Sequence, residues 1–145
     1  MTRPIATPAE LLAAGRLQAV CLSVVTIATT LGPLADRIEP ADERWRIAAL
    51  ADLRSLEAAA AQRATMFALP AWVGAERAAI VSALEQVAST AVMAAQAVRT
   101  GNASSFTALV RCRLPRVLHA LTAGLEAITR AMMDMRPARG VGFAC

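Results

Sequence analysis

A run of 19 residues without a charged side chain, from Leu17 to Ala35, is the feature that most restricts how this chain can fold. Apolar residues recur within it at the three- and four-residue spacing of one helix face: Leu17, Val20, Val24, Ile27 and Leu31. The other side of the same helix carries uncharged and mostly weakly polar side chains. A helix that is apolar most of the way round is buried on more than one side. We therefore expect this segment to be the central helix of a helical domain or part of a subunit interface.

The same run is almost as long as the roughly 20 apolar residues that cross a bilayer. A glutamine, a serine and three threonines interrupt it, however, and lipid-facing helices avoid such side chains. Gly32 and Pro33 then mark its end. The sequence thus favours a buried helix of a soluble domain over about residues 8–31, with Thr7 as its N-terminal cap.

Two further amphipathic helices are predicted in the middle of the chain. The first of them is expected from about Pro40 to Pro70, with Trp45 on its apolar face. The next is expected to stop at Gly101 and Asn102, which suit a helix C-terminus. Its apolar positions follow a seven-residue repeat, which predicts one face packed against other helices: Ile80, Leu84, Val87, Ala91, Ala94 and Val98.

The last helix is expected to begin near Ser104 or Ser105 and to contain Pro115, which removes a backbone hydrogen bond. Apolar residues there again step by four and three: Leu114, Leu118, Leu121, Leu125, Ile128, Met132 and Met135. Short connections make sequential helices antiparallel. We therefore expect an all-α fold over residues 1–136, an up-down four-helix bundle whose last helix is kinked or split at Pro115. A loose tail is expected over residues 137–145.

Composition excludes several classes of protein. Hydrophobic residues make up 57% of the chain and 35 residues are alanine, which excludes a disordered chain. All 15 basic residues are arginine, spread along the chain and not interleaved with the five Trp and Phe residues, so no specific nucleic-acid interface is expected. Cys21, Cys112 and Cys145 lie far apart, without a metal or redox motif. Free thiols fit a reducing compartment, which predicts a cytoplasmic location.

No set of catalytic residues is recognisable, and His119 is the single histidine. We therefore expect neither enzyme activity nor a bound cofactor or metal. The excess of apolar helix surface instead predicts a non-catalytic interaction protein, a scaffold, adaptor or chaperone-like subunit. It would form a homo-oligomer or bind an amphipathic partner helix. The expected contact residues are the stripe Leu17 to Leu31 of the first helix, together with Trp72 and Met133.

Three arginines around Pro115 suggest a candidate anion site: Arg111, Arg113 and Arg116. If a helix restarts at Pro115, its free N–H groups and these guanidinium groups can hold an anion, and the alternative is a solvated charged face beside a kink. Two alternative functions remain for the whole chain. One is an amphipathic protein that coats a membrane or storage-granule surface. The other is a regulatory bundle that senses a small molecule between its alanine-rich helices.

Overall fold

Alanine, leucine and arginine, which favour helix, are abundant in every long segment of the chain. The computed structural model describes residues 7–62 and 74–143, and in the second range the side chains of residues 75–131 and of Met133. These residues form helices, caps and turns and contain no strand, which confirms the all-α class for this part of the chain. The elements are α1 (Pro8–Asp36), α2 (Glu43–Ala60), α3 (Gly74–Arg99), α4 (Ala103–Ala108), the π-helical segment η3 (Leu109–Arg113) and α5 (Leu114–Phe143).

α1 begins as predicted but ends later. The Thr7 hydroxyl accepts a hydrogen bond from the Glu10 N–H, and the Glu10 carboxylate accepts one from the Thr7 N–H, each at 3.2 Å. The stop expected at Pro33 is wrong, because the helix continues through it to Asp36. Pro33 and Thr29, whose carbonyl loses its usual N–H partner, both face solvent, where water can supply the missing donor.

Trp45, in the first turn of α2, secures this longer end of α1. Its indole N–H donates to the carbonyl oxygen of Leu34 at 3.1 Å, which satisfies an acceptor that a helix end leaves free. Its ring meets the ring of Phe106 in α4 edge-on, with 5.3 Å between the ring centroids. One largely buried side chain therefore joins three helices.

α2 is shorter than predicted. The Asp42 carboxylate accepts a backbone N–H of the first turn at 3.0 Å, so the helix begins at Glu43 and not near Pro40. It ends at Ala60. Residues 63–73, which include most of the remaining expected helix, lie outside the described residues.

The repeat predicted for the third helix is confirmed in α3. Its six apolar positions are at most 2% exposed, while Glu85 and Gln96 between them face solvent. The predicted stop is confirmed as well, since Gly101 has a φ of 71°, a left-handed conformation that favours glycine. The Asn102 side chain then accepts the Ser105 N–H at 3.1 Å and so caps α4.

α4, η3 and α5 follow one another without a loop and form one long rod. The wider turn of η3 lies where a kink or break beside Pro115 is predicted. The Leu114 N–H donates to the carbonyl of Leu109, five residues back, so one extra residue is accommodated before Pro115 enters the first turn of α5. Residues 137–143 of the expected loose tail instead continue α5 to Phe143.

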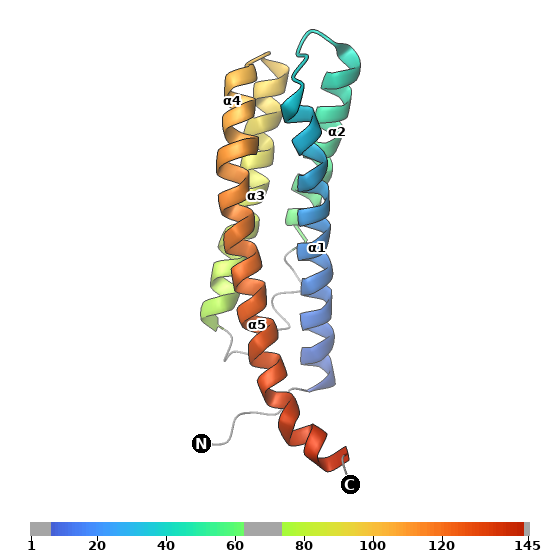
Figure 1. Ribbon diagram of the computed structural model, residues 1–145, viewed down its shortest axis with the longest axis vertical. Helices are drawn as coiled ribbons and strands as arrows, with labels where there is room; N and C mark the ends of the chain where they lie inside the picture. Colours follow the sequence, from blue (N-terminus) through green and yellow to red (C-terminus); the bar gives the residue numbers. More distant parts are fainter. Residues whose placement is uncertain (1–6, 63–73, 144–145) are drawn as a thin grey trace.

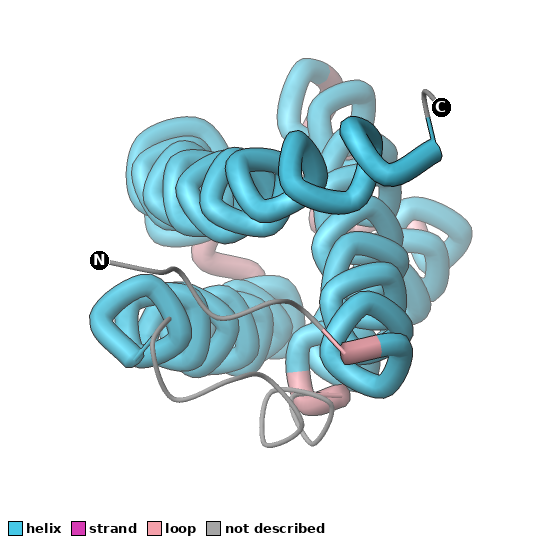
Figure 2. Tube along the Cα trace, turned by 90° about the horizontal axis from the view of Figure 1, so that it is seen from below, coloured by secondary structure: helices cyan, strands magenta, loops and turns pink. Residues whose placement is uncertain are grey.

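Four helical rods pack side by side, and the direction of the chain alternates from one to the next (Figure 1). α2 packs between α1 and α3, and α5 packs between α3 and α1, so the four rods close a ring (Figure 2). α1 and α3 therefore occupy opposite corners. Of the four neighbouring pairs, α1 and the last rod are packed least extensively.

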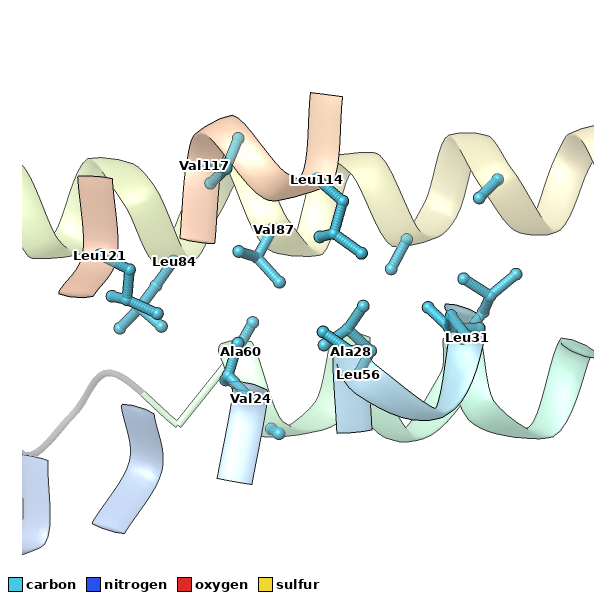
Figure 3. Packing of buried hydrophobic residues seen from close by; sticks show 14 of the residues in the cluster. Val24, Ala28, Leu31, Leu56, Ala60, Leu84, Val87, Leu114, Val117 and Leu121 are labelled. Carbon is cyan, nitrogen blue, oxygen red and sulfur yellow. The ribbon is translucent and has the colours of Figure 1, made fainter. Parts of the chain in front are cut away.

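Side chains from all four rods meet along the middle of this ring (Figure 3). Val24 and Leu31 of α1, Leu56 of α2, Leu84 of α3 and Leu121 of α5 are all 0% exposed. Burying one such side chain contributes about 1.5–3 kcal/mol to folding. Alanines such as those of α3 fill the space between them and allow the rods to approach closely.

A close approach of α5 to α3 depends on Gly124. A Cβ on this residue would lie 2.7 Å from Cγ1 of Ile80, a fully buried and β-branched side chain with little freedom to turn away. Glycine lowers helix stability by about 1 kcal/mol relative to alanine, and the packing on α3 offsets that loss. At Gly15 of α1, in contrast, a Cβ would have no neighbouring atom within 4 Å.

We expect Gly15→Ala and Gly124→Ala to change stability in opposite directions. In Gly15→Ala the higher helix propensity raises the free energy of unfolding by about 0.5–1 kcal/mol. In Gly124→Ala, overpacking against Ile80 outweighs the gain in helix propensity and lowers the free energy of unfolding by about 1 kcal/mol. Guanidinium unfolding followed by circular dichroism measures both changes. A stabilised Gly124→Ala variant would contradict the close packing of α5 on α3.

Candidate functional site

Two open hollows lie along the junction of α1 with the last rod. The upper hollow, at the end of the molecule drawn uppermost in Figure 1, has a volume of about 340 Å³. Its lining is mostly apolar, with an acid and a base: Ala28, Thr29, Gly32, Asp36, Val110, Arg111, Leu114, Pro115 and Leu118. The lower hollow has a volume of about 410 Å³ and lies mostly against α5: Gln18, Thr122, Leu125, Glu126, Thr129, Arg130 and Met133.

Helical spacing makes the two hollows parts of one surface. On α1, Gln18, Leu22, Val25, Thr29 and Gly32 follow one another at steps of four and three residues, so they lie along one side of the helix. On α5 the facing row has similar steps and leads to Met133. We call this surface the α1/α5 seam and define it by these two rows: Gln18, Leu22, Val25, Thr29 and Gly32 with Pro115, Leu118, Thr122, Leu125, Thr129 and Met133.

Two large apolar side chains project from the seam. Leu22, between the levels of the two hollows, and Met133, at the lower hollow, are each 57% exposed. Val25, Leu118 and Leu125 beside them are half-buried. The α1 side of the seam thus presents an apolar and uncharged surface to solvent.

Two of the three threonines of the seam, Thr29 and Thr122, add little polarity to it. The Thr29 hydroxyl donates to the carbonyl of Thr26 at 2.6 Å, and the Thr122 hydroxyl donates to the carbonyl of Leu118 at 2.9 Å. A polar group that is already hydrogen-bonded within its own helix costs little to cover. Contact with another apolar surface therefore leaves these donors satisfied.

Charged residues stand at both ends of the seam. At the upper end, Arg111 of η3 forms an ion pair with Asp36 at the end of α1. At the lower end, Glu126 and Arg130 are exposed, and neither forms an ion pair with another side chain in the described part of the chain. Each end therefore carries one acid and one base, with no charge in the rows between them.

The apolar stripe predicted as a contact surface lies in the chain's own core. Four of its five side chains are at most 8% exposed: Leu17, Val20, Val24 and Leu31. Ile27 is half-buried. This corrects the sequence-based expectation, because the other rods cover the stripe and leave the opposite side of α1, with Leu22, open to solvent. Figure 3 shows Val24 and Leu31 within that core.

Of the other expected contact residues, Met133 belongs to the seam, and Trp72 lies outside the described residues. Leu22 and its row are not among the contact residues predicted from the sequence. Leu22 does follow Gln18 by four residues and precede Val25 by three, which is a helical row. The row does not stand out because a glutamine and a threonine flank its two large apolar members.

The three arginines predicted to hold an anion do not converge. Arg111 pairs with Asp36 of α1, which neutralises its charge. Arg113 reaches α3, where its guanidinium donates to the sulfur of Met93 at 3.6 Å. Arg116 is exposed, and no free helix N-terminus lies beside it, because η3 passes into α5 without a break. The predicted anion site is therefore not assembled.

A third, smaller hollow between α2 and α3 serves as a comparison. Its volume is about 240 Å³, and half of its six lining residues are charged: Glu43, Arg46, Ile47, Leu50, Val98 and Arg99. Ile47 is 60% exposed there, slightly more than Leu22. An exposed apolar side chain alone thus does not distinguish the seam, whereas the absence of charge around Leu22 does.

Two helices, α1 and residues 75–99 of α3, are long and apolar enough to cross a membrane. Core helices of soluble proteins share these properties. In this fold the two helices stand at opposite corners of the ring, and each turns one side toward the shared core.

Reactive groups are few in the described part of the chain. It contains no cluster of three or more His, Cys, Asp and Glu residues that could hold a metal ion. His119 is exposed on α5, and Cys112 is an exposed free thiol on η3. Burial raises the pKa of the Cys21 thiol from 9.0 to about 11, so Cys21 is protonated and unreactive at neutral pH.

Comparison with known proteins yields no relative of this chain: no protein-family model, no curated protein and no solved structure matches it. Its function is therefore inferred from the geometry of the seam.

We expect the two described cysteines to differ in reactivity and in their effect on stability. In a Cys145→Ser variant at pH 8, a thiol reagent modifies Cys112 rapidly and Cys21 only after unfolding. Because the folded-state pKa of Cys21 is raised, its contribution to stability is complete below pH 9 and is lost as the pH rises through about 11. Thermal unfolding between pH 8 and 11, with Cys21→Ala as control, measures this loss. Equal rates of modification for both thiols would contradict the burial of Cys21.

Proposed function

We propose that the chain is a non-catalytic interaction protein, folded as an up-down four-helix bundle, that binds a helical protein surface along the α1/α5 seam. The observation that carries this proposal is the exposure of Leu22 on a side of α1 that has no charge from Leu17 to Ala35. Apolar surface rimmed by polar residues marks interaction sites on soluble proteins. A scaffold, an adaptor or a chaperone-like subunit works through such a surface.

The shape of the seam favours a helix as the bound element. From Gln18 to Asp36 the α1 side extends over about 27 Å, the length of a helix of about 18 residues. Helix-in-groove binding uses apolar side chains at steps of three and four residues, the same steps that the seam rows follow. Both hollows are open on the surface, whereas a small molecule binds best in an enclosed pocket.

Site-specific photo-cross-linking tests this function. We replace Leu22 with p-benzoylphenylalanine in the cells that make the protein and, as the matched control, replace Ile47, which is at least as exposed but has charged neighbours. We expect a discrete protein adduct from position 22 and none from position 47. Irradiation that gives no adduct at position 22, or the same adducts at both positions, would contradict the proposal.

A second candidate function is attachment of the same side of α1 to a membrane or granule surface. The length and hydropathy of α1 favour it, and so does its open, charge-free side. If this candidate holds, the protein floats with anionic phospholipid vesicles at low and high salt, and Leu22→Glu abolishes flotation while Ile47→Glu does not. Protein that stays at the bottom of the gradient at both salt concentrations contradicts it.

A further inference from the structure

We infer that the helical surface bound by the seam is the seam of a second copy of this chain, in a two-fold dimer that sets α1 antiparallel on α1. This inference rests on the proposed function and names the partner. It follows from three features of the seam: a projecting leucine placed off centre, a hollow that can receive it, and charges of both signs at each end.

The two hollows establish which residues of α1 and of the last rod lie at the same level. The upper hollow places residues 28–36 of α1 beside residues 110–118. The lower hollow places Gln18 beside residues 122–133. Leu22 therefore lies between the hollows, about 12 Å below the level of Thr30 by the rise of an α-helix.

The position of Leu22 decides how two seams fit together. A second copy placed level with the first sets each Leu22 against the part of the seam between the hollows. In the antiparallel arrangement, a two-fold axis lies at the level of Thr26. Each Leu22 is then at the level of Thr30 in the other copy, beside Thr29 and Gly32. That level is the upper hollow, whose volume of about 340 Å³ exceeds that of a leucine side chain. The dimer thus contains two identical contacts of a projecting side chain with a hollow.

The same arrangement brings opposite charges together. Counted from the axis at Thr26, Asp36 of one copy lies level with Arg130 of the other, and Arg111 lies within one helical turn of Glu126 of the other. Glu126 and Arg130 have no ion-pair partner among the described side chains of their own chain, and the dimer places them beside the existing Asp36–Arg111 pair of the other copy, so that the four groups form one network. Charge complementarity of this kind sets register and orientation between partners.

Small side chains on α1 allow the two helices to approach at the axis. Ala19, Ser23, Thr26 and Thr30 are exposed in the row of α1 next to the seam, on the side toward α2. The Thr30 hydroxyl already has acceptors for its proton within its own chain, the carbonyl oxygen of Ile27 at 2.6 Å and the Asp52 carboxylate at 3.0 Å. The axis region is therefore narrow, and the Thr30 hydroxyl keeps its hydrogen bonding when the region is covered.

Sedimentation equilibrium of the full chain tests the dimer. We expect a species of twice the 15.2 kDa chain mass at micromolar concentration. Leu22→Glu should raise the dissociation constant at least about 30-fold, the effect of losing a central apolar contact. Ile47→Glu, at a site of similar exposure outside the seam, should leave it unchanged. Circular dichroism checks that both variants keep their helix content. A monomer at 100 µM, or a dimer that Leu22→Glu leaves intact, would overturn the inference.

Cross-linking tests the antiparallel register. In a Cys112→Ser, Cys145→Ser background, Thr26→Cys lies at the level of the two-fold axis, so a short bis-maleimide should join two copies through it. Leu12→Cys lies 14 residues from the axis, so its two copies are separated by about 42 Å and should not be joined. Cross-linking through Leu12→Cys, or none through Thr26→Cys, would overturn the register.

The photo-cross-linking at position 22 separates this inference from the proposed function. An adduct with twice the mass of the chain supports both. An adduct formed only with a different protein overturns the self-association and leaves the proposed function standing. The absence of any adduct overturns both.

Discussion

The hydrogen bond and ring contact of Trp45 are the interactions on which the upper part of the structure depends. A proline inside a helix costs about 3 kcal/mol, yet α1 continues past Pro33 because the indole binds the carbonyl of Leu34 and its ring packs on Phe106. Since α1 continues, Asp36 reaches Arg111, and their ion pair lies in the lining of the upper hollow. Trp45, at the start of α2, thus determines where the end of α1 meets η3.

The two contacts of the last rod differ in kind, and this difference creates the seam. Against α3, Gly124 allows α5 to lie almost in contact with Ile80. Against α1, the rod makes fewer contacts, and both hollows of the seam lie there. A core that mixes alanine with leucine and valine holds helices close together where a small residue faces a large one, and on the α1 side the open rows carry leucine, methionine and threonine. The open surface is therefore a result of how the core is packed.

The parts of this architecture that depend on local pattern were predictable from the sequence. The seven-residue repeat and Gly101 define α3, and Thr7 and Glu10 define the start of α1. The parts that depend on long-range contact were not. Continuation beyond Pro33 depends on Trp45, which lies in the next helix. The side of α1 that stays open to solvent could not be predicted from its sequence, because both sides lack charge. The packing of the other rods determines which side is covered.

The π-helical segment η3 changes the rotation of the following helix, α5, about its own axis. Phe106, Val110 and Leu114 are spaced by four residues, a spacing that drifts around a regular α-helix, yet all three are buried, because the wider turn between them absorbs the drift. Without that additional residue in the turn, α5 would be rotated by about 100° about its own axis. Val117 and Leu121 would leave the core, and the row that ends at Met133 would no longer border α1. The single wide turn of η3 therefore determines how α5 is rotated about its own axis. It also determines which α5 residues are exposed beside α1.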